Sequence, residues 1–363
     1  MISYWEKTAL LKPRDLIIIG GGIVGMRSAL EYKKIFPEAD VLILERGILP
    51  GGASTRNAGF ACFGSVTELI DDSNQHGTDA AFDLVNARYQ GLQLLRTTMG
   101  DEAIGFSMPG GYELFTDKSI FEEAVSRIPE FNARLEGFTG EPEMYTATEF
   151  EGYMAIHTKQ EGYLHSGKLV KQLGDMVRKN GIELWNNCEV QSCSKQAVRL
   201  KDGLTLEATN VLAATNAFTR HLLSEVSIKP ARGYVCVTKP ISHLWKGTFH
   251  FDKGYIYFRD LGDRILIGGG RNKDFKGEET TEMEINPVIK NYIHNFLSET
   301  LRLGDTWEAE YEWPGIMGFG DSKMPIIRKT EEGIFVAAGL GGMGVALGME
   351  TARRVAGLIA ESR

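Results

Sequence analysis

A short glycine-rich turn, Gly20-Gly21-Gly22-Ile23-Val24-Gly25, carries the strongest chemical signal in the chain. Glycines in the pattern G-x-G-x-x-G let the backbone turn tightly, approach a pyrophosphate and pack a helix closely on a strand. The free amides at the start of that helix also attract phosphate. Glu45 follows twenty residues after Gly25, where a carboxylate accepts hydrogen bonds from a ribose diol. The pattern predicts a dinucleotide site formed by Gly20, Gly22, Ile23, Val24, Gly25 and Glu45.

The turn alone does not separate FAD from NAD, and Arg46 beside the carboxylate leaves NADP open. The next stretch, from Gly51 to Phe60, is rich in small residues and short hydrogen-bond donors. That composition suits close passage of the backbone along a large planar cofactor with a diphosphate. The candidate contacts here are Arg46, Ala53, Ser54, Thr55, Arg56, Asn57, Ala58 and Gly59.

A second strand, glycine turn and helix close the chain. The apolar run Ile334–Ala338 is followed by Gly339-Leu340-Gly341-Gly342-Met343-Gly344 and then by a helical pattern to about Ile359. A helix N-terminus directed at a flavin would stabilise the negative charge of its reduced form. If the dinucleotide is FAD, the amides of Gly342, Met343 and Gly344 would face the flavin, with Gly339 and Gly341 also in contact with the cofactor.

These motifs, in this order, resemble the D-amino-acid oxidase superfamily of FAD-dependent oxidoreductases, which includes glycine oxidase and sarcosine oxidase. Within it, the chain looks most like the gamma-glutamylputrescine oxidases, because of the stretch Gly52–Gly59 and of Ser3-Tyr4-Trp5 near the start. The resemblance implies that Asn57–Phe60 approach the flavin and that backbone groups of Val190 hold the adenine. It also implies that Ala214, Thr215 and Asn216 form a turn near the pyrophosphate.

The resemblance also bears on how the flavin is attached and on the substrate. Some relatives attach the flavin to a cysteine near the C-terminal turn, where this chain has none, so we expect non-covalent FAD. Amino-acid oxidases of the superfamily have an arginine before a proline that pairs with the substrate carboxylate, a role that suits the planar guanidinium. Trp313-Pro314 stands at that position, which weakens the case for a simple α-amino acid and leaves room for an amine or a conjugate of one. Gly315 beside it is a further candidate cofactor contact.

Four side chains are candidates for the substrate pocket. Tyr255 and Tyr257 are expected on one face of a strand, because they are two residues apart. Arg271 is a candidate cation, as are Arg232 and Arg259. With Trp313, the candidates are therefore Tyr255, Tyr257, Arg271 and Trp313, and no residue is assigned as acid or base.

The function predicted from these residues is oxidation of the carbon–nitrogen bond of a small-molecule amine or amino acid. Hydride would pass to flavin N5, the imine would hydrolyse in water, and oxygen or another acceptor would reoxidise the flavin. Two alternatives stay open: an FAD-dependent 2-hydroxy-acid dehydrogenase, which usually needs a histidine base where this chain has Met343, and a non-catalytic flavoprotein. An NAD-dependent dehydrogenase is disfavoured by the stretch Ala53–Phe60 and by the C-terminal turn.

The elements needed to position these residues follow from the hydrophobic pattern. Buried strands are expected at 16–19 and 41–44 with a helix between them at 23–34, and a helix at 166–180. Between 234 and 270 four short alternating runs predict antiparallel strands, with a hairpin turn at 261–263. The fold class predicted is α/β: an FAD-binding Rossmann-type, glutathione-reductase-like domain with an inserted α+β substrate domain containing a mixed or antiparallel sheet. The FAD-binding domain is expected to comprise 1–85, 155–225 and 325–363, and the substrate domain 86–154 and 226–324.

The composition of the chain disfavours some classes of binding partner and indicates a cellular compartment. The chain has 363 residues, 43% of them hydrophobic, enough for two domains with packed cores. A formal net charge of −8 disfavours nucleic acid, which normally requires a basic face. No run approaches the roughly 20 apolar residues that a membrane span requires. Four scattered cysteines indicate reduced thiols, and we expect a cytoplasmic protein.

Overall fold

The computed structural model describes residues 1–242 and 245–362 and divides into two compact units. Unit 1 comprises 1–55, 167–230 and 317–363, and unit 2 comprises 56–166 and 231–316. The chain is a mixed α/β protein, as predicted. No helix in the described ranges has both the length and the apolar character that crossing a membrane requires.

A parallel sheet forms the centre of unit 1. Its strand order is β17-β18-β11-β1-β2-β8, and the five strands from β18 to β8 run parallel. In addition, β10 pairs with β11, and β9 pairs with β10. The strands are β1 (Arg14–Ile19), β2 (Val41–Leu44), β8 (Glu183–Trp185), β9 (Val190–Cys193), β10 (Ala197–Leu200), β11 (Thr205–Ala213), β17 (Ile326–Lys329) and β18 (Phe335–Ala338). β2 and β18 are fully buried and β1 nearly so, which is why the sequence shows them as continuous apolar runs.

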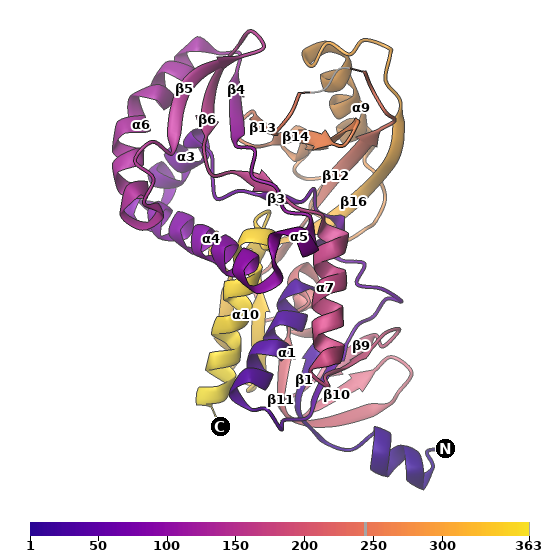
Figure 1. Ribbon diagram of the computed structural model, residues 1–363. Helices are drawn as coiled ribbons and strands as arrows, with labels where there is room; N and C mark the ends of the chain where they lie inside the picture. The colour runs from indigo at the N-terminus through magenta and orange to yellow at the C-terminus, as the bar shows by residue number, and fades with distance from the viewer. Residues whose placement is uncertain (243–244, 363) are drawn as a thin grey trace. The chain divides into compact units, whose positions relative to one another are not determined.

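Helices of unit 1 bury this sheet. They are α1 (Ile23–Ile35), α7 (Ser166–Lys179), which begins at the edge of unit 2, the short α8 (Thr219–Leu222) and α10 (Gly344–Glu361). α1 and α10 lie side by side, although they come from opposite ends of the chain (Figure 1). Gly348 allows this close approach, because a Cβ there would lie 2.9 Å from Ile23 Cγ2. The predicted strand–helix–strand at 16–44 and the helix at 166–180 are confirmed.

A mixed sheet forms the centre of unit 2, with the order β16-β12-β15-β14-β13-β4-β6-β5. The strands are β4 (Gly111–Phe115), β5 (Tyr145–Phe150), β6 (Tyr153–Thr158), β12 (Lys229–Thr238), β13 (Thr248–Phe251), β14 (Ile256–Leu261), β15 (Arg264–Gly269) and β16 (Ala309–Phe319). Most pairs are antiparallel, and β13 with β4 is parallel. The four strands and the hairpin turn predicted between 234 and 270 are confirmed, with Gly262 at φ +67° in the turn.

The remaining elements of unit 2 pack around that sheet or border the loop that follows Arg56. α3 (Val66–His76), α4 (Thr78–Met99) and α6 (Lys118–Thr139) pack against one another (Figure 1). The others are α2 (Ala53–Arg56), which ends at the first residue of unit 2, β3 (Phe60–Ala61), α5 (Asp101–Ile104), β7 (Gly162–Tyr163) and α9 (Pro287–Asn295). β3 pairs with β7, which joins the loop to residues a hundred positions later. In unit 1, β19 (Leu340–Gly341) pairs with the last residues of β16.

The boundaries of the two units differ from the domain boundaries that the sequence predicted. Residues 56–85 and 155–166, expected in the FAD-binding domain, belong to unit 2. Residues 226–230 and 317–324, expected in the substrate domain, belong to unit 1. Which unit binds which molecule stays a prediction.

Candidate functional site

The predicted cofactor motifs of unit 1 gather at the carboxyl edge of its parallel sheet. The glycine turn follows β1, Glu45 follows β2, Ala214 follows β11 and Gly339 follows β18. Because these strands are parallel neighbours, their carboxyl ends meet at one edge. Ligands of open α/β sheets bind at this edge.

The glycine turn has the geometry that a dinucleotide requires. Gly20 has φ +111°, and a Cβ there would lie 2.6 Å from the Ala214 carbonyl oxygen. A Cβ on Gly25 would lie 1.9 Å from the Gly20 carbonyl oxygen, so only glycine fits. Gly22 is the N-cap of α1 and has no side chain of its own to cap that end, and the first turn of the helix contains no acidic residue. The first turn of α1, which contains Ile23 and Val24, is therefore suited to an anion.

Ser54 lies opposite this helix end. Its hydroxyl oxygen accepts a hydrogen bond from the Ile23 amide at 3.0 Å, and a Cβ on Gly22 would lie 2.8 Å from that oxygen. The Thr55 hydroxyl donates to the Pro50 carbonyl at 2.6 Å and fixes the short helix α2, which starts at Ala53. The hydroxyl of Ser54 and the first amides of α1 thus converge where a diphosphate would lie.

Glu45 is buried and held in place by backbone amides. Its Oε2 accepts from the Gly21 amide at 2.9 Å, and its Oε1 accepts from the Gly47 amide at 3.0 Å. The Cys188 amide donates to the Glu45 carbonyl at 2.9 Å, which holds the segment leading to Val190 beside it. Arg46 instead stacks on Phe218, with its guanidinium carbon 3.8 Å from the ring centre. A fixed carboxylate with lone pairs to spare suits a ribose diol.

The turn after β11 joins the C-terminal turn. Asn216 has φ +47°, and its Oδ1 accepts from the Gly339 amide at 3.1 Å. The Thr215 and Thr219 hydroxyls lie 2.9 Å apart. Taken with the glycine turn, these residues form a cradle in which an added Cβ at Gly20, Gly22 or Gly25 would collide, and they fit the adenosine diphosphate part of FAD.

One amide of the C-terminal turn has a hydrogen-bond partner within the turn. The Met343 amide donates to the Leu340 carbonyl at 3.1 Å, so it is used within the turn. The cause is Gly341 at φ +57°, which bends the chain back before α10 begins. Of the three amides expected to face a flavin, those of Gly342 and Gly344 remain.

In unit 2, the loop after Arg56 is fastened to the Trp313 segment. The Trp313 indole donates to the Arg56 carbonyl at 3.0 Å, and Arg56 Nη1 donates to the Pro314 carbonyl at 3.2 Å. A Cβ on Gly315 would lie 3.0 Å from the Arg56 carbonyl oxygen. Asn57 Oδ1 accepts from the Gly59 amide at 2.8 Å and from the Ser166 hydroxyl at 2.7 Å. The structure thus brings together Arg56, Trp313 and Gly315, three predicted site residues.

The four substrate-pocket candidates separate into two groups. Tyr257 and Trp313 pack with Phe60 around the buried Ala58. Tyr255 and Arg271 both contact Phe275 instead. Tyr255 lies just before β14, so the expected pair on one strand is not formed. Burial raises the pKa of Tyr257 to about 12, and it therefore stays a neutral phenol.

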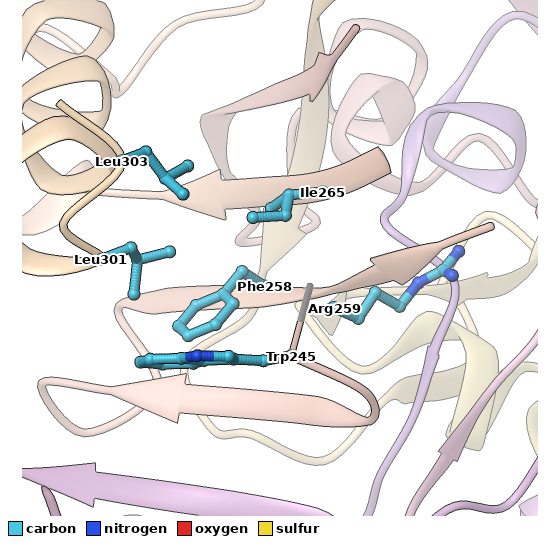
Figure 2. Close-up of a pocket in the computed structure, with 6 residues that line it drawn as sticks. All are labelled: Trp245, Phe258, Arg259, Ile265, Leu301 and Leu303. Carbon is cyan, nitrogen blue, oxygen red and sulfur yellow. The ribbon is translucent and has the colours of Figure 1, made fainter. Parts of the chain in front are cut away.

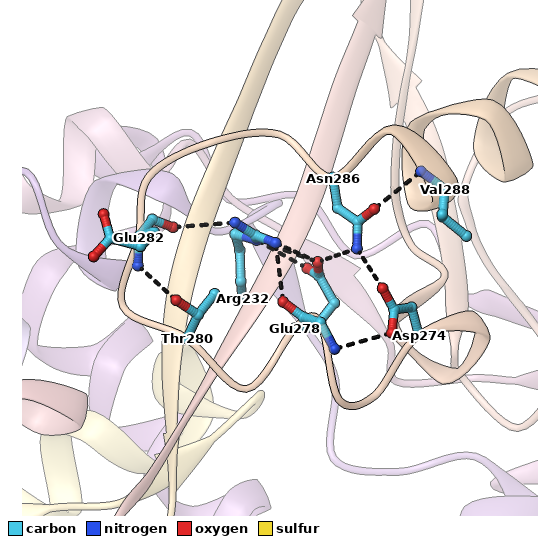
Figure 3. A network of polar contacts seen from close by, with 8 residues as sticks. Arg232, Asp274, Glu278, Thr280, Glu282, Asn286 and Val288 are labelled. Atoms are coloured by element: carbon cyan, nitrogen blue, oxygen red, sulfur yellow. Dashed lines mark hydrogen bonds and ion pairs between the residues drawn. The ribbon is translucent and has the colours of Figure 1, made fainter.

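Two of the arginines considered as substrate cations have other partners. Arg232 forms a buried ion pair with Glu278 within a wider polar network (Figure 3). Arg259 donates to the Ala58 carbonyl at 3.0 Å and stacks on Tyr163, and burial lowers its pKa to about 10. Arg259 also borders a small pocket whose other side chains are apolar: Trp245, Phe258, Ile265, Leu301 and Leu303. Figure 2 shows that the Arg259 guanidinium points away from these side chains. Burial also lowers the pKa of Arg271.

A polar cluster that the sequence did not reveal lies beside Phe60. Glu161 Oε1 and His250 Nε2 are 2.5 Å apart, and Cys62 is close enough for all three donor atoms to lie within 4.8 Å of one another. Phe60 contacts the His250 ring at 5.4 Å. Glu161 and His250 are 89 positions apart, so no motif spacing joins them.

Comparison with known proteins agrees with this geometry. Residues 15–358 match the family model of the FAD dependent oxidoreductases (DAO), and the chain belongs to this family, within the D-amino-acid oxidase and glycine oxidase superfamily. It is thus an FAD-dependent oxidoreductase. A search of curated proteins found no match, so the likeness to gamma-glutamylputrescine oxidases stays a prediction.

Solved structures share the fold at low sequence identity. Glycine oxidase from Geobacillus kaustophilus is 21% identical with a TM-score of 0.76, covering 96% of this chain and 95% of that one. Iminodiacetate oxidase from Chelativorans sp. BNC1 is 18% identical with a TM-score of 0.75, covering 95% of each chain. L-proline dehydrogenase from P. horikoshii is 17% identical with a TM-score of 0.73, covering 98% and 95%. At these identities the likeness establishes the fold.

Proposed function

We propose that this oxidoreductase oxidises the carbon–nitrogen bond of a small amine or amino acid, with FAD held non-covalently. The observation that carries the proposal is the group of motif residues at the carboxyl edge of the sheet of unit 1. Unit 2, considered by itself, contains an aromatic cluster around the loop after Arg56. Glycine oxidase and iminodiacetate oxidase, two structures of the same fold, are named for substrates that contain amines.

The residues of unit 1 have separate roles in holding the cofactor. The start of α1 and Ser54 would bind the diphosphate, Glu45 the ribose and the segment at Val190 the adenine. The turn of Ala214, Thr215 and Asn216 would line the pyrophosphate, and Gly342 and Gly344 would donate amides to the flavin. When bound, FAD supplies the hydride acceptor and the protein supplies position and electrostatics.

Non-covalent attachment is supported by the state of Cys62, the thiol nearest in sequence to the loop that is expected to approach the flavin. Cys62 lies two residues after Phe60, and burial together with Glu161 raises its pKa well above the ordinary value. A thiol is a poor nucleophile unless it ionises. Acid precipitation of the purified protein should therefore leave its flavin in the supernatant, and yellow colour in the pellet would contradict this.

The reaction is tested by the visible spectrum of the purified protein under anaerobic conditions. Glycine, sarcosine, putrescine and benzylamine are added one at a time, followed by lactate and glycolate. Bleaching of the oxidised-flavin bands by an amine is the expected result. Bleaching by a 2-hydroxy acid alone would favour the dehydrogenase, and flavin that nothing reduces would favour a non-catalytic flavoprotein.

A further inference from the structure

A row of side chains crosses one face of the sheet of unit 2. His250 on β13 is paired with Tyr257 on β14 and with Glu113 on β4, so the three side chains share that face. Tyr257 lies over Gly268 on β15, where a Cβ would be 2.6 Å from its ring. The row thus places a histidine between a phenol and a buried carboxyl group.

Glu161 holds one nitrogen of His250. Its carboxylate lies over Gly111, where a Cβ would be 2.5 Å from the carboxyl carbon. Its Oε1 accepts from the Thr248 hydroxyl at 2.8 Å and lies 2.5 Å from His250 Nε2. A carboxylate in this position orients an imidazole and fixes its tautomer. Since Nε2 is bound to Glu161, Nδ1 is the nitrogen that can meet a ligand.

The dyad, meaning His250 and Glu161, borders the loop that is proposed to approach the flavin. The Phe60 ring contacts the His250 ring and the Tyr257 ring, each at 5.4 Å between centres. Trp313 packs in the same cluster as Phe60 and Tyr257. The dyad therefore lies beside this aromatic cluster, and Arg259, which is opposite Thr248 on the same face, is the cation nearest in register.

The charge around the dyad suits a cationic substrate. Glu161 and Glu113 are 1% and 3% exposed. The nearby Arg88 is paired with Glu68 and with the Phe63 carbonyl, so its charge is already engaged. Buried carboxylates favour an ammonium group and disfavour the carboxylate of a 2-hydroxy acid.

We propose that His250, positioned by Glu161, takes a proton from the ammonium group of the substrate amine. The N–H bond of the ammonium breaks, its electron pair stays on the amine nitrogen, and the proton moves to Nδ1 of His250. The neutral amine that results is the form that can lose a hydride. This inference rests on the proposed function and assigns it a cationic amine substrate with a proton acceptor.

The experiment compares His250→Gln with His157→Gln, each loaded with FAD. His157 is the matched control, because it is on β6 of the same sheet but in the row of Tyr112 and Phe249, whose side chains point to the other face. The rate of anaerobic flavin reduction is measured with each amine that reduces the wild type. We expect a loss of roughly 100-fold or more for His250→Gln, the range of general-base catalysis, and little change for His157→Gln.

A second measurement follows the protonation of His250 directly and needs no substrate. NMR of isotope-labelled histidine follows the titration of His250, assigned by the signal missing in His250→Gln, in the wild type and in Glu161→Gln. The His250 signal should move with pH at a lower midpoint in Glu161→Gln, with the flavin spectrum unchanged. This measurement also covers the case in which His250→Gln loses its flavin.

The possible outcomes distinguish a failure of the proposed role of His250 from a failure of the proposed amine oxidation. If an amine reduces the wild type and His250→Gln reacts equally fast, the proton acceptor is another group and the inference is overturned. An unchanged midpoint in Glu161→Gln removes the positioning role. If no amine reduces the wild-type flavin, the proposed function fails and the inference falls with it.

Discussion

At the scale of single residues, the chemistry depends on groups whose ionisation the fold has changed. Burial lowers the pKa of His250, but the carboxylates of Glu161, Glu113 and Glu68 raise it by more, so the net shift is upward. The titratable groups that face the ring are Glu161, Glu113, Glu68, Cys62 and Tyr257. A more basic imidazole is a better acceptor for the proton of an alkylammonium ion.

The upward shift fixes the sign of the pH dependence. Neutral His250 is the base, so the rate of flavin reduction should rise with pH through the pKa of His250, above the ordinary histidine value. Glu161→Gln removes the main partner that raises this pKa, so the midpoint of the rate profile should move to lower pH. The measurement is anaerobic reduction by one amine, so that ionisation of the substrate is common to both proteins. A midpoint that moves upward would contradict the assignment.

Glu45 offers a second residue-scale prediction. Its carboxylate accepts two backbone amides, and the proposed ribose contact would add charge-assisted hydrogen bonds of about 1.5–3 kcal/mol. Glu45→Gln should therefore weaken FAD binding roughly 10- to 100-fold, as measured by flavin fluorescence titration of the apoprotein. Glu38→Gln, at an exposed position, is the control. Equal affinities of the two variants would exclude the ribose contact.

At the scale of elements, glycines decide how closely helices approach strands. Gly25 in α1 leaves no room for a Cβ beside the Gly20 carbonyl, whereas Gly357 in α10 has no atom within 4 Å of its Cβ position. The first glycine is therefore required by packing, while the second only weakens its helix.

Paired substitutions test this difference. Gly25→Ala should lower the free energy of unfolding by about 1–3 kcal/mol through overpacking. Gly357→Ala should raise it by about 0.5–1 kcal/mol, because alanine is the better helix former. Chemical denaturation of the two apoproteins measures both values. A Gly25→Ala protein as stable as the wild type would show that the turn relaxes without cost.

Local sequence patterns were enough to predict the elements that are proposed to hold the cofactor. The apolar runs at 16–19 and 41–44 and the glycine turn between them predicted β1, α1 and β2 because each signal lies within a few residues. Tyr255 was wrongly placed on β14 because strand ends depend on pairing, which local spacing does not report. The row of Glu113, His250 and Tyr257 could not be predicted, because it depends on the register of three strands from distant parts of the chain.

At the scale of the whole molecule, the proposed site makes folding stability depend on the cofactor. A ligand that binds the native state alone stabilises it by mass action, by about 2.7 kcal/mol at a concentration of 100 Kd. The proposed FAD contacts in unit 1 come from its three separate chain segments, so FAD can bind only when that unit is folded. FAD should therefore raise the melting temperature of the apoprotein by roughly 3–5 °C at that ratio, whereas NAD at the same concentration, which shares only the adenosine diphosphate part, should raise it by less. Thermal unfolding followed by circular dichroism measures both, with Gly25→Ala as the control in which the FAD effect is lost. An equal shift with NAD would mean that the cradle recognises adenosine diphosphate alone, and the assignment of Gly342 and Gly344 to the flavin would then lose its support.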